Sequence, residues 1–426
     1  WEFHDTDTDI TNNVVDGTGV PNDDDANCPV GFTGDQCEPY WDLGWTWSQP
    51  AIARIGIYDT SGNARPDDVW VAFFGGGWDR TETDITGLYF YGVNIETGAT
   101  VVKENIGVAV PGTPALLDSD NDGFHDRIYF GDTNGAIWRL QFPSPFTAAA
   151  TGAAAGTLRR IFDVSTTALT TTYGRQQFFH EPTLVPVVFN GANYTYAVAM
   201  GSGDRANLGE DTSSTVNHFF VVLDDLDNDS GANPAYDESD LVPRAYGDLV
   251  NAFTPDPGAT LCTDSAFDTE KGWYLSLRND LASTPPGGSE KVNFKATIFA
   301  SHVYFTTFQP TDDTADNPPE ICVPATPPGT PSPTATPDPT APIAPEVCRA
   351  SGIGRMYDVG LACGLGEYTE VNDVLTGIAT WTIGNTTYVQ GTTSGAGSTG
   401  GITGGLGPRK EHAVDIIAST TNWRQE

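Results

Sequence analysis

The sequence predicts an all-β fold, a β-propeller with long inserted loops. Short apolar runs rich in β-branched and aromatic residues recur between Gly, Asn and Asp turn formers, and no long stretch has helical periodicity. Many short strands at even spacing are typical of sandwiches, barrels and propellers. Two stretches of strand-turn-strand form favour the propeller among these three.

The predicted strands are bounded by turn formers and are rich in residues that favour extended backbone. The clearest runs span residues 69–74, 127–130, 194–200, 218–223 and 302–308.

Two hairpins stand out, at residues 89–102 and 127–140. The first turns at Glu96-Thr97-Gly98 and the second at Asn134-Gly135, a strong hairpin signal. Both resemble blade hairpins of quinoprotein-like propellers. Because one blade cannot bury both of its faces, a ring of blades of about four strands each is implied.

Composition divides the chain further. Residues 1–40 are acidic and poor in apolar residues, and residues 28–37 look like the last loop of an EGF-like module, so this part is predicted to be an extended arm. The propeller is predicted to span residues 41–426. Within it, the Pro/Thr-rich stretch 323–346 and the Gly-rich stretch 391–407 are predicted loops.

Six cysteines and no CxxC pattern indicate an oxidising compartment with up to three disulfides. Six cysteines allow 15 pairings. Cys28–Cys37 bracket a short turn-rich stretch, Cys322–Cys348 would close the base of the Pro-rich loop, and Cys262–Cys363 then remain.

The chain carries 56 acidic and 20 basic residues, a formal charge of −36. Such a chain repels nucleic acid and anionic lipid and attracts cations, although acidity also serves solubility in a salty exterior. No stretch approaches the roughly 20 apolar residues that span a bilayer. We therefore expect a soluble, extracellular product whose numbering starts inside a longer or processed protein.

The sharpest motif is Asp118-Ser119-Asp120-Asn121-Asp122-Gly123-Phe124-His125-Asp126. Carboxylates at positions 1, 3, 5 and 9 with Gly at position 6 have the spacing of an EF-hand-type Ca²⁺ loop, in which position 7 contributes its backbone carbonyl. The predicted ligands are Asp118, Asp120, Asp122, the Phe124 carbonyl and Asp126.

Position 12 of this loop, where an EF-hand has a bidentate Glu, is Tyr129, and a strand follows in place of a helix. The alternative is a solvated acidic turn, but carboxylates this close repel one another without a cation. A second stretch matches the spacing of this Ca²⁺ loop more weakly, because it has Ser230 where Gly is expected. Its candidate ligands are Asp225, Asp227, Asp229, Gly231 and Asn233.

An ordered series of motifs resembles the PilY family of type IV pilus biogenesis and tip proteins. The matching stretches are 43–50, 71–77, 96–98, 118–126, 129–139, 181–183, 201–205, 272–275 and 423–426. The resemblance runs from about residue 41 to 426. The arm and the Pro-rich insert depart from the family pattern, and the family's N-terminal half, which often carries a von Willebrand-type domain, has no counterpart here.

The resemblance implies a modified seven-bladed propeller that is not an enzyme. It further implies a calcium loop that influences pilus extension and retraction, with roles in adhesion and twitching motility. The implied partners are minor pilins of the pilus tip complex and a host or abiotic surface. The implied location is the pilus tip or outer membrane of a Gram-negative bacterium.

Two other functions compete. A quinone-cofactor dehydrogenase is disfavoured because such enzymes usually need eight blades and adjacent cysteines, and the six histidines occur in no catalytic motif. A secreted binding module for a glycan or surface ligand would use exposed tryptophans such as Trp78.

Overall fold

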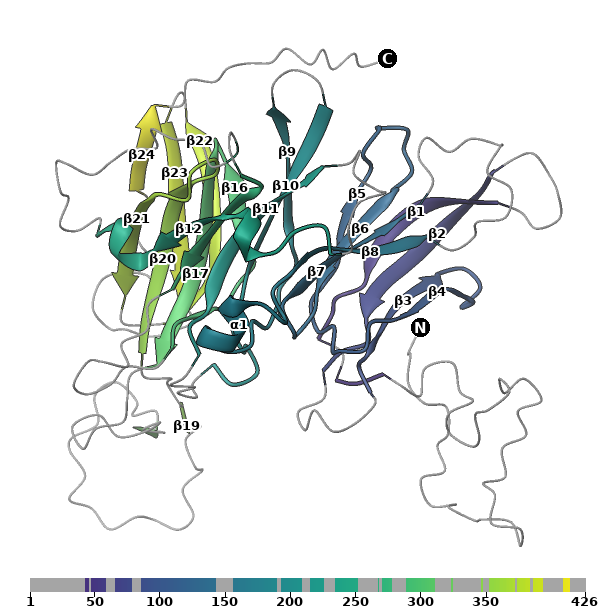
Figure 1. The fold of residues 1–426 in the computed structure, drawn as a ribbon, viewed down its shortest axis with the longest axis horizontal. Coiled ribbons are helices and arrows are strands. Elements are labelled where there is room, and N and C mark those ends of the chain that lie inside the picture. Colours follow the sequence, from purple (N-terminus) through teal and green to yellow (C-terminus); the bar gives the residue numbers. More distant parts are fainter. Residues whose placement is uncertain are drawn as a thin grey trace, which may run out of the picture. The chain divides into compact units, whose positions relative to one another are not determined.

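In the computed structural model, the regular secondary structure of the described residues is almost entirely β-strand (Figure 1). The structure describes residues 43–45, 47–58, 66–78, 86–142, 156–189, 193–208, 215–225, 234–251, 267, 270–277, 289–310, 323–324, 346–347, 352–371, 374–383, 386–393 and 409–413. Among them, no helix has the length and apolar character needed to cross a bilayer.

The chain divides into two compact units. The first comprises Trp1–Asp204, His218–Pro243 and Ser265–Leu275, and the second comprises Arg205–Asn217, Arg244–Asp264 and Ser276–Glu426.

The first unit begins with two four-stranded antiparallel sheets of consecutive strands (Figure 1). The first sheet has the order β1 (Ala51–Tyr58), β2 (Pro66–Gly75), β3 (Tyr89–Asn94) and β4 (Thr100–Asn105). The second sheet has the order β5 (Ala115–Leu117), β6 (Arg127–Gly131), β7 (Ala136–Gln141) and β8 (Thr157–Asp163). Each strand pairs antiparallel with the next strand along the chain, which gives this up-and-down order.

The third sheet has five strands. Its order is β12 (Val242–Ala245), β14 (Gly272–Ser276), β11 (His218–Asp225), β10 (Asn193–Gly201) and β9 (Thr183–Phe189). The described residues include a short helix α1 (Ala168–Tyr173) and the 3₁₀ turns η2 (Glu238–Asp240) and η3 (Tyr246–Asp248).

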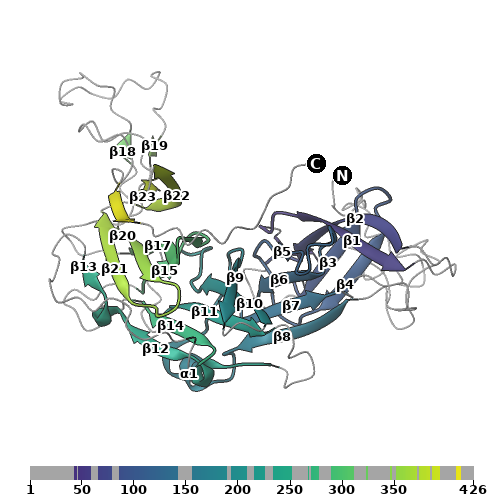
Figure 2. The same ribbon diagram turned by 90° about the horizontal axis from the view of Figure 1, so that it is seen from above.

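The second unit contains a six-stranded sheet, a three-stranded sheet and a two-stranded sheet (Figure 2). The large sheet has the order β13 (Val250–Asn251), β21 (Gly366–Val371), β20 (Gly352–Gly360), β17 (His302–Pro310) and β15 (Lys291–Val292), with β16 (Thr297–Phe299) also on β17. The others are β22 (Leu375–Ile383), β23 (Thr386–Thr393) and β24 (Arg409–Ala413), and the pair β18 (Val323–Pro324) and β19 (Glu346–Val347).

Strand β6 is buried on both faces, because successive side chains of a strand point to opposite faces of its sheet. Ile128 and Phe130 join a core cluster with the first sheet, and the Phe130 ring stacks on Phe90 at 4.0 Å between centroids. Tyr129 joins a second cluster with residues of the third sheet, including Phe220. Sheets stacked face to face through such cores are the packing of propeller blades.

The structure confirms the predicted fold class. The five predicted runs lie in β2, β6, β10, β11 and β17, and the two predicted hairpins are β3–β4 and β6–β7. Gly98 and Gly135 both have positive φ, as their turns require. The blade number of seven and the closure of the ring stay predictions.

Several predicted features fall outside the described residues. They are the arm at 1–40 with its Cys28–Cys37 pair, most of the loops at 323–346 and 391–407, and positions 226–233 of the weaker acidic loop. Only the backbone of Asp225, the last residue of β11, is described from that loop.

Candidate cation site

The acidic loop connects β5 to β6 in the second sheet, as the sequence predicted. One carboxylate oxygen from each of Asp118, Asp120 and Asp122 lies within 4.8 Å of the other two. Asp118 is half-buried, whereas Asp120 and Asp122 are exposed. The alternation of ligand positions therefore brings three of the predicted residues together at one point.

The carboxylates of the loop also stabilise its turn by accepting backbone hydrogen bonds. Asp118 accepts hydrogen bonds from the backbone N–H of Asp122 at 3.2 Å and of Gly123 at 2.9 Å, and Asp122 accepts one from Phe124 N–H at 2.8 Å. Asn121 and Gly123 have φ of 59° and 90°, left-handed values that Asn and Gly adopt most readily. These two residues explain why the chain can turn so tightly here.

The donor set fits a hard divalent cation. Ca²⁺ binds oxygen at about 2.3–2.6 Å, so two oxygens on one ion are at most roughly 5 Å apart. The three carboxylate oxygens, which all lie within 4.8 Å of one another, satisfy that limit. Without a cation, each pair of carboxylates at this separation repels by about 1 kcal/mol in water and by about 3 kcal/mol at an effective dielectric constant of 20. The cluster could thus hold a metal ion, and Ca²⁺ is compatible with it.

Asp126, the predicted ligand at position 9, is not among the three carboxylates of the cluster. It is 3% exposed, and its carboxylate accepts hydrogen bonds from the Ser119 N–H at 2.7 Å and the Ser119 hydroxyl. The same carboxylate lies 3.5 Å from Arg127 Nε. Because position 9 of an EF-hand loop often meets the ion through a water, the ligand roles of Asp126 and of the Phe124 carbonyl stay predictions.

The first sheet also contacts the loop, through a residue that the sequence did not single out. The Arg54 guanidinium lies over the Phe124 ring at 4.4 Å, and the Arg54 carbonyl accepts a hydrogen bond of 2.7 Å from His125 N–H. Arg54 belongs to β1. No local pattern marks such a residue, because the contact depends on the stacking of two sheets.

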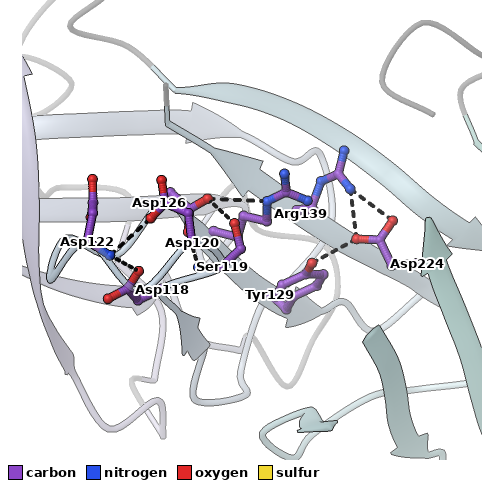
Figure 3. A network of polar contacts seen from close by, with 9 residues as sticks. Asp118, Ser119, Asp120, Asp122, Asp126, Tyr129, Arg139 and Asp224 are labelled. Carbon is purple, nitrogen blue, oxygen red and sulfur yellow. Dashed lines mark hydrogen bonds and ion pairs between the residues drawn. The ribbon is translucent and has the colours of Figure 1, made fainter. Parts of the chain in front are cut away.

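Beyond the loop, a buried polar network follows along the second sheet (Figure 3). The Tyr129 hydroxyl donates to Asp224 at 2.7 Å, and Arg139 donates to both oxygens of Asp224 at 2.9 and 2.7 Å. Burial raises the pKa of Tyr129 well above its ordinary value, and the nearby Asp224 carboxylate raises it further. Tyr129 stands where the EF-hand pattern has Glu, but no local pattern in the sequence indicates its partner Asp224.

The remaining predicted residues have mixed outcomes. Cys363 is fully buried and disulfide-bonded, and its partner lies outside the described residues, so the pairing with Cys262 stays a prediction. The expectation that Trp78 is exposed is wrong, since it is 5% exposed and packs against Phe179. Trp45 and Trp47, at 61% and 41%, are the exposed tryptophans of this cluster.

The fold and this loop together define a class: an all-β domain of propeller type that has an acidic, EF-hand-like loop between two strands of one sheet. The structure is similar to that of the Pseudomonas aeruginosa PilY1 C-terminal domain, with a TM-score of 0.50, 17% identity, and coverage of 84% of this chain and 72% of that one. The resemblance to the PilY C-terminal domain is thereby confirmed for the fold.

A sequence similarity points to the same family. The type IV pilus biogenesis factor PilY1 of Pseudomonas aeruginosa (strain UCBPP-PA14) is 32% identical to this chain over 104 residues, which are 23% of this chain. The match spans only 8% of the length of that protein. No family model matches the chain.

Proposed function

We propose that this chain is the calcium-binding propeller of a protein that works with type IV pili at the surface of a Gram-negative bacterium. The observation that carries the proposal is the meeting of Asp118, Asp120 and Asp122 on a PilY1-like fold. The 32% match to a protein named a type IV pilus biogenesis factor supports the pilus role.

The chemistry proposed for the loop is binding rather than catalysis. Asp118, Asp120 and Asp122 would hold the ion, with the Phe124 carbonyl and Asp126 completing the site directly or through water. A bound Ca²⁺ would supply the positive charge that offsets the repulsion among the carboxylates. The proposed partners are minor pilins and a host or abiotic surface, and the proposed outcomes are adhesion and control of pilus extension and retraction.

The test is Asp122→Ala, which removes one carboxylate of the cluster. In isothermal titration calorimetry we expect Ca²⁺ affinity to fall at least tenfold, and in cells carrying the full-length protein we expect altered twitching motility. Glu96→Ala is a matched control, because Glu96 is an exposed carboxylate in the β3–β4 turn of the same unit. Unchanged Ca²⁺ affinity would overturn the site, and lost affinity with unchanged motility would leave the ion a structural role.

The alternative, a secreted binding module, is favoured by one observation. The exposed Trp45 and Trp47 rings rest on Trp78, at centroid distances of 6.5 and 5.6 Å, and such supported aromatic surfaces are common in ligand recognition. Copurification with minor pilins would favour the pilus role. A glycan affinity that is lost in Trp45→Ala and Trp47→Ala, without any pilin partner, would favour the module.

A further inference from the structure

Tyr129, at position 12 of the acidic loop, contacts a neighbouring sheet, whereas the glutamate at this position of an EF-hand binds the ion. Tyr129 is fully buried in β6, three residues after Asp126, and its side chain faces the third sheet. Figure 3 shows the loop carboxylates at one end of a row of polar residues and the Tyr129 hydroxyl at the other, where it meets Asp224. The strand that begins at the end of the loop is therefore held by the neighbouring sheet.

The contact of Tyr129 and Arg139 with Asp224 is buried, so breaking it would cost free energy of folding. Asp224 lies in β11 and is 3% exposed, and Arg139 in β7 is 2% exposed. Tyr129 and Arg139 are directly opposite one another in the β6–β7 register, so the second sheet presents both donors from one point. A buried carboxylate that loses such a partner keeps its desolvation cost, so small displacements of β6 are penalised.

The loop and Tyr129 are joined by a short, fully paired length of backbone. Asp126 N–H donates to the Leu117 carbonyl at 3.0 Å, and the Asp126 carbonyl accepts from Phe142 N–H at 2.7 Å. A strand rises about 3.3 Å per residue, so Tyr129 is roughly 10 Å along the strand from the end of the loop. All five residues of β6 are buried, which leaves the strand little freedom to bend.

We propose that Tyr129 and Asp224 are positioning residues of the cation site. They hold β6 so that the loop ends in its ion-binding geometry, and occupancy of the loop in turn strengthens the contact between the second and third sheets. This inference rests on the proposed calcium site and adds a coupling to it. Such coupling is reciprocal: whatever the Tyr129–Asp224 contact adds to ion affinity, the ion adds to the stability of that contact.

The test is Tyr129→Phe, which removes a hydroxyl that contacts no loop carboxylate and keeps the buried ring. We expect the Ca²⁺ dissociation constant to rise about fivefold or more, the low end of typical coupling energies. We also expect the rise in melting temperature on adding Ca²⁺ to shrink. Asp224→Asn, which keeps the shape and an acceptor for Tyr129 but loses the charge paired with Arg139, should act in the same direction if Tyr129→Phe does not fold.

Tyr357→Phe is the matched control. Tyr357 in β20 is also fully buried, and its hydroxyl also donates at 2.7 Å to a buried carboxylate, that of Glu290, in the second unit. It should lower the melting temperature and leave the Ca²⁺ dissociation constant within twofold.

The coupling is overturned if Tyr129→Phe keeps the dissociation constant within twofold and loses the same stability with and without Ca²⁺. In that case, loss of binding in Asp122→Ala would still sustain the proposed calcium site. A wild-type chain that binds no Ca²⁺ would overturn both.

Discussion

Each of the two units contains a buried network of a tyrosine, an arginine and a carboxylate. The two networks differ in whether they connect strands of one sheet or of two sheets. In the first unit Tyr129 and Arg139 meet Asp224, and in the second Tyr357 and Arg355 meet Glu290. Each has a tyrosine that donates at 2.7 Å and an arginine that neutralises the carboxylate. The pattern recurs because a buried carboxylate needs both charge and hydrogen bonds.

The network of the first unit joins two sheets, whereas that of the second unit stays within one. Asp224 reaches the second sheet from β11 of the third. Arg355 and Tyr357 are two residues apart on β20 and so share a face, and Glu290 directly precedes β15 of the same sheet. A network within a sheet fixes the strands of that sheet, while a network between sheets can couple the position of a loop to the packing of a neighbouring sheet.

The largest effects should follow from removing the arginines. Arg139→Met and Arg355→Met each leave a buried carboxylate without its cation, and we expect each to destabilise its unit by about 3–5 kcal/mol. Urea denaturation followed by tryptophan fluorescence and by circular dichroism would measure this, with two transitions if the units unfold separately. A loss below about 1 kcal/mol for Arg355→Met would show that the Thr307 and Tyr357 hydroxyls suffice as partners of the Glu290 carboxylate.

Removing both charges of the Arg139–Asp224 ion pair separates the electrostatic contribution from the packing contribution. Replacing Arg139 by Met together with Asp224 by Leu should restore part of the stability lost in the single variant, because an apolar pair carries no desolvation cost but the buried Tyr129 hydroxyl loses its acceptor. If the double variant is no more stable than the single one, the packing between the two sheets depends on the shape of the ion pair, and the electrostatic explanation fails.

The tyrosine hydroxyls should contribute less than the arginines. Tyr129→Phe and Tyr357→Phe each remove one hydrogen bond to a charged group, and we expect about 1.5–3 kcal/mol for each. Thermal denaturation in EDTA gives the two values without the cation. In Ca²⁺ the loss for Tyr129→Phe should grow, while that for Tyr357→Phe should stay constant; equal growth for both would contradict a difference between the networks.

The smallest effect concerns pH and belongs to the second unit. The hydrogen bond from His302 to Asp358, at 2.6 Å, raises the pKa of His302 above its ordinary value, and Glu367 adds to the rise. A raised folded-state pKa stabilises the fold fully below about pH 6.5 and loses that contribution as pH rises through the folded value. His302→Gln should flatten the fall in stability as pH rises above about 6.5, and an unchanged slope would exclude His302 as its source.

Much of the fold could be predicted from sequence because its signals are local. The apolar run at 69–74 and the Asn134-Gly135 turn each specify their own backbone within a few residues. The three carboxylates of the loop were predictable for the same reason, since alternate positions of a tight turn point inward whatever surrounds it.

Local sequence patterns thus predict the β class, the hairpins and the meeting of Asp118, Asp120 and Asp122. Three other features depend on the tertiary structure: Asp126 accepts hydrogen bonds from Ser119, Trp78 is buried, and Tyr129 contacts Asp224, 95 residues away. The physical reason is that backbone turns depend on neighbours in the chain. The partner of a buried side chain depends on which sheets stack, and no short pattern records that choice.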